Sequence, residues 1–165
     1  MGSYLDNATK NVQEICDSII KSEKLQGPHA LRIGLISYRD HPPQDYTYIL
    51  KNFGFTHDIE QMRDNLKSLY ASGGGDGPEA VTSALSDAIN NMPWRANSSK
   101  MAVLVADAPP HGIGEYGDGF PNGSPCGNDP LQLARLMASN SITLVRTLYF
   151  KYSYLLIICL VRCCL

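Results

Sequence analysis

Apolar and polar positions along the chain repeat with two periods, one typical of helices and the other of buried strands. Four segments have an apolar residue every three or four positions and are predicted helices: 3–24, 59–70, 78–91 and 130–138. Four shorter segments, rich in β-branched or aromatic residues, are predicted strands: 30–38, 46–55, 101–106 and 141–148. Strands that alternate with helices predict an α/β fold with a mostly parallel central sheet flanked by helices.

Residues at the element ends refine this prediction. Asp58 and Asp129 stand where an N-cap is expected, directly before helical segments. Asp76 and Glu79 have the spacing of a capping box at the start of the third helix. The connection between the first two strands is short, so we expect the 46–55 strand to run antiparallel to its neighbour.

The run from Met101 to Ala106 contains no polar residue and predicts a strand buried on both faces of the sheet. It ends at Asp107, and Pro109 and Pro110 prevent the ladder from continuing. Ligands of open α/β sheets bind at the carboxyl ends of the strands. Asp107 is therefore a candidate ligand, with a turn residue as the alternative.

A second carboxylate, Asp76, follows three glycines in a loop that feeds the third helix. With ordinary crossovers it reaches the same sheet edge as Asp107, and two converging carboxylates suit Mg²⁺. We expect Gly73, Gly74 and Gly75 to provide a tight backbone path, since a phosphate-binding loop would need a following Lys-Ser/Thr. Glu79 is expected to cap the helix or face solvent in support of this loop.

Four segments carry a family resemblance: Met1-Gly-Ser-Tyr-Leu-Asp6, Arg32–Asp40, Ser72–Ala80 and Val105–Gly112. Together they resemble a von Willebrand factor A domain, of the type found in hemicentin-like proteins and beside some alpha-kinase domains. The resemblance covers residues 1–148 and implies a Rossmann-like fold. It also implies that the chain starts downstream of the first central strand, which would lie between the 30–38 and 101–106 strands.

The resemblance further implies a metal-ion-dependent adhesion site, in which Asp76 and Asp107 are ligands of Mg²⁺, Mn²⁺ or Ca²⁺. In this family, a carboxylate from a protein partner completes the coordination. The first loop of the site, Asp-x-Ser/Thr-x-Ser, is absent from this sequence, so the site is expected to be partial and to bind metal weakly. The expected function is protein binding rather than catalysis.

The segment 149–165 has no cap, turn or helical period, and we expect it to stand outside the domain. Its apolar run is too short to span a bilayer, which takes about 20 residues. Because a central strand is expected to be missing, we expect the 165-residue chain alone to be aggregated or molten. The alternative is that this tail is structural and fills the gap.

Composition narrows the remaining function classes. The net charge is -2 and there is no basic run, so nucleic-acid binding is not expected. The sequence shows no signal peptide.

Two alternative functions remain open: a regulatory appendage of an alpha-kinase-type protein, and a Mg²⁺-dependent hydrolase that uses Asp107. His111 could serve a hydrolase or zinc site, but no His or Cys stands at ligand spacing from it. Cys126 lies in a Gly/Pro-rich loop and is expected to be exposed.

Overall fold

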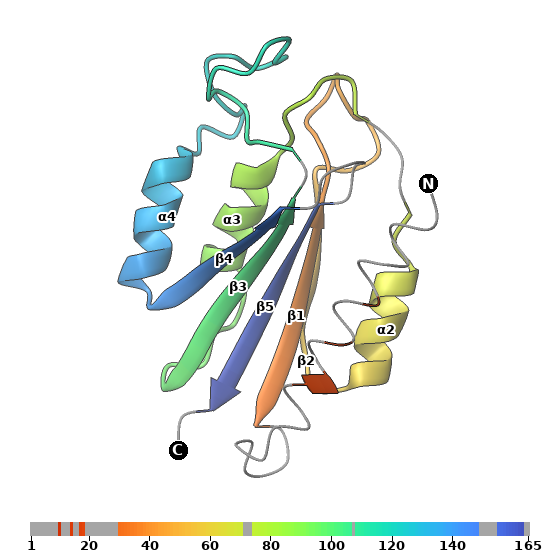
Figure 1. The fold of residues 1–165 in the computed structure, drawn as a ribbon, viewed down its shortest axis with the longest axis vertical. Coiled ribbons are helices and arrows are strands. Elements are labelled where there is room, and N and C mark those ends of the chain that lie inside the picture. Colours follow the sequence, from red (N-terminus) through yellow and green to blue (C-terminus); the bar gives the residue numbers. More distant parts are fainter. Residues whose placement is uncertain are drawn as a thin grey trace.

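The computed structural model describes residues 10, 14, 17, 18, 30–70, 74–106, 108–148 and 155–163. Within these residues the chain is a mixed α/β structure built on one five-stranded sheet (Figure 1). The strands are β1 (Leu31–Tyr38), β2 (Leu50–Thr56), β3 (Ser98–Ala106), β4 (Ile142–Leu148) and β5 (Leu155–Cys163). Their order across the sheet is β2-β1-β5-β3-β4.

The strand directions are mixed. β3 and β4 pair in parallel, whereas β5 is antiparallel to both β1 and β3, so β1, β3 and β4 all point the same way. β2 is antiparallel to β1, which confirms the expectation from the short connection. Only one of the four pairings among the described strands is parallel. The prediction of a mostly parallel sheet is therefore wrong, because it did not include β5.

The centre of the sheet is β5, which comes from the tail that was expected to stand outside the domain. Eight residues of β1 pair with β5 on one side, and eight residues of β3 pair with it on the other. The facing edges of β1 and β3 carry backbone N–H and C=O groups that need partners. The run Leu155–Cys163, rich in Leu, Ile and Val, supplies them. The gap expected at this position is thus filled by an antiparallel strand.

Three described helices cover the sheet: α2 (Ile59–Lys67), α3 (Val81–Asn90) and α4 (Pro130–Ser139). The helix expected at 3–24 falls largely outside the described residues. Asp58 and Asp129 are confirmed as N-caps, since each accepts hydrogen bonds from backbone N–H groups of the first helical turn. The capping box predicted for Asp76 and Glu79 is wrong: α3 begins at Val81, and no side chain caps it. No described helix has the length and apolar character needed to cross a membrane.

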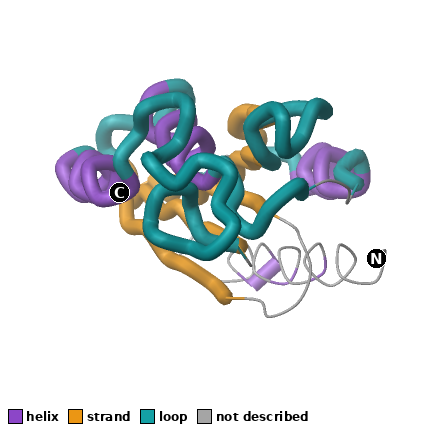
Figure 2. Tube along the Cα trace, turned by 90° about the horizontal axis from the view of Figure 1, so that it is seen from above, coloured by secondary structure: helices purple, strands orange, loops and turns teal. Residues whose placement is uncertain are grey.

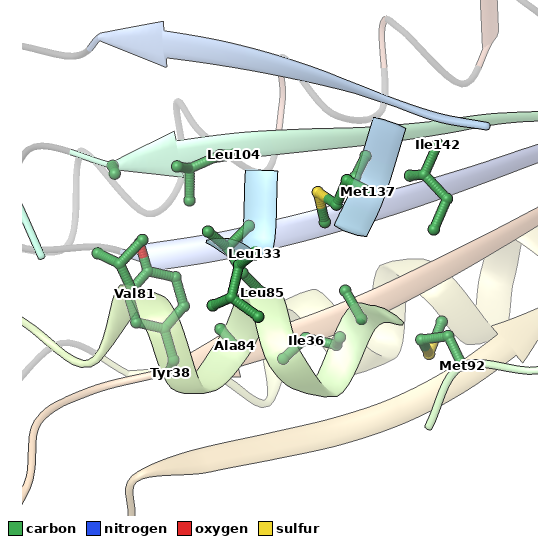
Figure 3. Close-up of a cluster of buried hydrophobic side chains, with 13 residues drawn as sticks. Ile36, Tyr38, Val81, Ala84, Leu85, Met92, Leu104, Leu133, Met137 and Ile142 are labelled. Carbon is green, nitrogen blue, oxygen red and sulfur yellow. The ribbon is translucent and has the colours of Figure 1, made fainter. Parts of the chain in front are cut away.

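The side chains of the sheet alternate between two hydrophobic clusters, one on each face. Ile36 and Tyr38 of β1 contribute to the larger cluster, which also contains buried residues of α3 and α4 (Figure 3). Ile33 and Leu35 point to the other face and pack with buried residues of α2. The same alternation on β3 places Leu104 in the first cluster and Val103 in the second. The result is a helix–sheet–helix sandwich.

Candidate functional site

The carboxyl ends of β1, β3 and β4 point to the top of Figure 1, where three loop segments gather. They are 39–49 after β1, 74–80 before α3, and 108–128 after β3, and Figure 2 looks down on them. Backbone hydrogen bonds join the three. Ala80 N–H donates to Arg39 O at 2.9 Å, and Glu79 N–H donates to Pro109 O at 3.0 Å. This edge is where the sequence predicted a ligand site.

Each of these segments contributes to a compact group one side chain of a type that can ligate a metal ion. Asp40 comes from the loop after β1, Asp76 from the loop before α3, and His111 from the loop after β3. One potential ligand atom from each residue lies within 4.8 Å of the other two. Asp40 and His111 are buried, and Asp76 is partly exposed, so the group opens to solvent on the Asp76 side.

The two carboxylates have the same pattern of contacts. Asp40 Oδ1 accepts hydrogen bonds from His41 N–H at 2.7 Å and from His111, while Asp40 Oδ2 is buried with no partner among the described residues. Asp76 Oδ2 accepts a hydrogen bond from Gly119 N–H at 2.6 Å, while Asp76 Oδ1 is buried and likewise has no partner in the part of the chain that the structure describes. Buried carboxylate oxygens are strong acceptors, and leaving them unpaired costs free energy. Each residue therefore has one anchored oxygen and one available for a ligand.

His111 is held between two carboxylates. Its Nε2 lies 2.6 Å from Asp40 Oδ1, and its Nδ1 lies 2.7 Å from Asp118 Oδ1. Asp118 is itself fixed, because its oxygens accept hydrogen bonds from Phe120 N–H at 2.7 Å and Gly112 N–H at 2.8 Å. The Phe120 ring packs edge-on against the imidazole, with ring centroids 4.8 Å apart. The orientation of the imidazole is thus set on several sides.

Burial and the interactions with neighbouring groups shift the pKa values of these side chains in opposite directions. Burial lowers the pKa of His111, but its hydrogen bonds and charge interactions with Asp40 and Asp118 outweigh burial and raise that pKa above the ordinary value. For Asp118, burial is outweighed by the hydrogen bonds from Gly112, His111 and Phe120, so its pKa is lowered. Burial dominates at Asp40 and raises its pKa, against the hydrogen bond from His111.

A buried ion pair stiffens the 39–49 loop next to this group. Arg39 Nη1 donates to Asp45 Oδ2 at 3.0 Å, with both side chains less than a tenth exposed. Arg39 also donates to Thr47 Oγ1 and to Tyr70 O, and its guanidinium lies over the rings of Tyr48 and Tyr70. These contacts of Arg39 therefore help to fix the backbone at the neighbouring residue, Asp40.

The predicted site residues have different outcomes. Asp76 lies in the group, as expected of a ligand. Asp107 and Gly73 lie outside the described residues, so their predicted roles stay predictions. Gly75 packs against Gln44, where a Cβ would come within 2.2 Å of the Gln44 side chain. Glu79 is buried and lies outside the group of three.

Gly74 has more space around it than Gly75, since a Cβ there would come no closer than 3.7 Å to another atom. Gly74 adopts a positive φ of 102°, a conformation that favours glycine. These contacts agree with a tight backbone path at 74–75.

Sequence reasoning missed Asp40 as a ligand and discounted His111. The segment Arg39-Asp-His-Pro-Pro43 was interpreted only as a turn. His111 was discounted because it has no ligand at close sequence spacing, yet Asp40 is 71 residues away along the chain. A usable signal was present: Asp40 comes two residues after the predicted 30–38 strand, much as Asp107 follows the 101–106 strand.

A second polar cluster lines an open groove of about 430 Å³ beside the start of α3. Cys126 Sγ contacts Ser124 Oγ at 2.9 Å, Ser83 Oγ at 3.3 Å and the Asn128 amide nitrogen at 3.1 Å. Both serine hydroxyls also contact His41 Nε2. Cys126 is exposed, as predicted. Burial raises its pKa, but the hydrogen bonds, that from Ser124 foremost, outweigh burial and lower the pKa of the thiol.

Two curated proteins are similar in sequence to this chain. Alpha-protein kinase vwkA of Dictyostelium discoideum is 32% identical over 123 residues, which cover 70% of this chain and 19% of that protein. Putative ariadne-like RING finger protein R811 of Acanthamoeba polyphaga mimivirus is 30% identical over 120 residues, covering 73% of this chain and 11% of that protein. The chain thus spans less than a fifth of the length of either relative. No family model and no solved structure matches the chain.

Proposed function

We propose that the chain is a protein-binding module of the von Willebrand factor A type, with a divalent cation at its loop edge. One observation carries the proposal: Asp40 Oδ2 and Asp76 Oδ1 are buried and unpaired in side chains that converge at this edge. The loop segments come from the carboxyl ends of β1 and β3, where such folds bind their ligands. Asp107, which directly follows β3 in the sequence, is expected to add a third carboxylate.

The chemistry of these residues fits a divalent cation. Two carboxylates that share a partly buried site repel each other, which favours protonation of one or the binding of a cation. Mg²⁺, Mn²⁺ and Ca²⁺ all accept carboxylate oxygens and fill the rest of their shell with water or a ligand. A cation held by Asp40 and Asp76 would retain open positions, and a carboxylate of a protein partner is a suitable group to occupy one.

Apolar side chains around the same edge support a protein partner. Tyr46 is 80% exposed in the 39–49 loop, and Ile113 and Tyr116 are exposed in the 108–128 loop. Exposed aromatic side chains are enriched at protein interfaces because they bury a large area with few rotatable bonds. A partner that reaches the cation could therefore cover these residues.

The two relatives support a module that works beside other domains. Their names describe different proteins, a kinase and a RING finger protein, yet each matches more than two-thirds of this chain through a small part of its own length. This favours a binding segment over a catalytic one. The regulatory appendage of an alpha-kinase-type protein is the second candidate, and the kinase relative favours it.

Calorimetry and a carboxylate probe test the proposal. Mg²⁺ and Mn²⁺ are titrated into the 165-residue chain. Binding of a fluorescent Gly-Gly-Asp-Gly-Gly peptide to the chain is then measured by fluorescence anisotropy, with either cation or with EDTA. We expect the chain to bind the cations. We also expect it to bind the peptide, and EDTA should reverse this binding. A peptide with Asn in place of Asp should not bind. Asp76→Asn should abolish both, whereas Glu115→Gln, at an exposed carboxylate of the 108–128 loop, should change neither.

Two results would overturn the proposal. Unchanged cation affinity in the Asp76→Asn variant would remove Asp76 from the site. Hydrolysis of ATP or p-nitrophenyl phosphate that requires both Mg²⁺ and Asp76 would assign the hydrolase alternative instead.

A further inference from the structure

His111 adds a nitrogen atom that can ligate a metal ion, which the two carboxylates alone would not provide. Imidazole nitrogen is a ligand for Zn²⁺, Fe²⁺, Ni²⁺ and Cu²⁺, whereas Mg²⁺ and Ca²⁺ select oxygen. His111 is entirely buried, and its Nε2 points toward Asp40, at 2.6 Å from Oδ1. The nitrogen lies beside the carboxylates with which it would share an ion, and an ion bound at Nε2 would replace the proton that Nε2 and Asp40 Oδ1 now share and release it to solvent.

The other ring nitrogen has the partner that a metal-binding histidine usually has. Histidine ligands of metals almost always donate the second N–H to a carboxylate or carbonyl, which fixes the ring and raises its basicity. Here His111 Nδ1 lies 2.7 Å from Asp118 Oδ1, and the Asp118 side chain is only 1% exposed. Asp118 is anchored by two backbone N–H groups, so it can hold the ring in one orientation.

The carboxylates are equally pre-arranged. Each uses one oxygen for a backbone N–H, from His41 or Gly119, and leaves the other buried and unpaired. Gly119 allows this approach because a Cβ there would lie 2.9 Å from Asp76 Oδ2 and 2.2 Å from the Gln44 amide. The unpaired oxygens are an observation separate from the clustering of acidic residues, and they point to a missing ligand.

We propose that Asp40, Asp76 and His111 form a centre for a first-row transition-metal ion, with Asp118 as the positioning residue for His111. The inference rests on the proposed function, because it specifies the cation that the loop edge binds. Three protein ligands leave coordination positions open, as in sites where a metal also binds an exogenous group. A partner carboxylate could take such a position.

Competition between metals tests the inference on the full chain. Zn²⁺, Mn²⁺ and Mg²⁺ are titrated by calorimetry, and Co²⁺ is added as a spectroscopic probe. We expect Zn²⁺ to bind at least about 100-fold more tightly than Mg²⁺, and bound Co²⁺ to show visible bands without the near-ultraviolet thiolate charge-transfer band. The absence of that band separates this centre from binding by Cys126 or the other cysteines.

Two variants separate ligand from positioning roles. His111→Gln should remove the preference for Zn²⁺, while His57→Gln, at an exposed histidine, should retain it. Asp118→Asn should weaken Zn²⁺ by about 10- to 100-fold and leave Mg²⁺ affinity unchanged, a split that a general loss of structure would not produce. If His111→Gln fails to fold, the imidazole ¹⁵N signals of the unaltered chain should still shift when Zn²⁺ is added.

The outcomes distinguish this inference from the proposed function. Equal Zn²⁺ and Mg²⁺ affinities, with binding lost in Asp76→Asn but kept in His111→Gln, would overturn the inference and leave the proposed function standing. A thiolate band in the Co²⁺ spectrum, with Zn²⁺ affinity unaffected by His111→Gln, would also overturn it. Failure of all of these cations to bind would overturn both.

Discussion

At the scale of single residues, the Cys126 thiol has an unusual set of neighbours. Two serine hydroxyls and an asparagine amide lie within 3.3 Å of its sulfur, and they are donors that stabilise a thiolate. Cys126 is nevertheless an exposed residue, and it lines a groove. Since the thiolate is the reactive form of cysteine, donors and exposure together favour reactivity.

We predict that Cys126 reacts with iodoacetamide faster at pH 7 than free glutathione does, with a pH midpoint below that of an ordinary thiol. Ser83→Ala should move this midpoint upward, because it removes one donor to the sulfur. Ser86→Ala is the matched control, since Ser86 lines the same groove but hydrogen-bonds to Asn90 instead. Peptide mass spectrometry assigns the label to Cys126. Identical rates in the Ser83→Ala protein would contradict the prediction.

Residue-level prediction from sequence succeeded where a pattern was local. The position of Asp76 at this edge could be predicted because it lies in a glycine-rich loop that precedes a predicted helix, while its role as a ligand stays a prediction. Asp40 and His111 could not be paired, because their contact depends on how two loops far apart in the chain meet. The orienting role of Asp118 depends on a local turn whose shape its sequence alone does not determine.

At the scale of elements, β5 is the strand on which the sheet depends most. It pairs along its length with β1 and β3, which do not pair with each other. Removing it would leave two rows of unpaired backbone groups in the middle of the sheet. Each net hydrogen bond is worth about 1 kcal/mol, so the loss is comparable with a whole domain stability of about 5–15 kcal/mol.

We predict that deletion of residues 150–165 abolishes the cooperative thermal transition, measured by circular dichroism and calorimetry. Deletion of residues 164–165 alone, which lie beyond β5, should leave the transition in place. A subtler variant, Cys159→Pro, should destabilise strongly, because residue 159 pairs with both Gly34 and Ala102 and proline lacks the N–H. Cys159→Ala is its control. An unchanged melting temperature after the longer deletion would show that β5 contributes nothing to stability.

The elements differ in how well sequence predicted them. β1, β2, β3 and β4 lie close to the predicted segments, because their apolar and β-branched runs are sharply bounded. The start of α3 was misplaced, because Pro78 was expected in its first turn, whereas α3 begins at Val81. Glu79 instead pairs with Pro110 in a short parallel bridge. The segment that forms β5 was predicted to stand outside the domain, yet it lies at the centre of the sheet; neither its composition nor its period specifies which strands lie beside it.

At the scale of the whole molecule, the buried charges of the loop edge couple its stability to pH. His111 has a higher pKa in the folded protein than its ordinary value near 6.5. The folded state therefore binds this proton more tightly than the unfolded state. The stabilisation is complete below about pH 6.5, the unfolded value, and is lost as the pH rises through the folded pKa.

We predict that the free energy of unfolding, measured with urea in EDTA, falls as the pH rises from 6 to 8. The slope can approach about 1.4 kcal/mol per pH unit, the limit for one proton. His111→Gln should flatten this dependence, whereas His57→Gln should keep it. If the free energy of unfolding of the His111→Gln protein still falls with pH by the same slope, the effect comes from another titratable group.

The place of β5 also has a consequence for the order of folding. β1 with β2, and β3 with β4, are each formed from segments close together in the sequence. β5 must join these two halves, and its pairing with β1 links residues that are 117 to 131 positions apart, from Tyr38 with Leu155 to Leu31 with Arg162. Closing such a loop is slow compared with local steps, so capture of β5 is expected to limit the folding rate. Until then, two open strand edges are available to other chains, and self-association during refolding should increase with protein concentration.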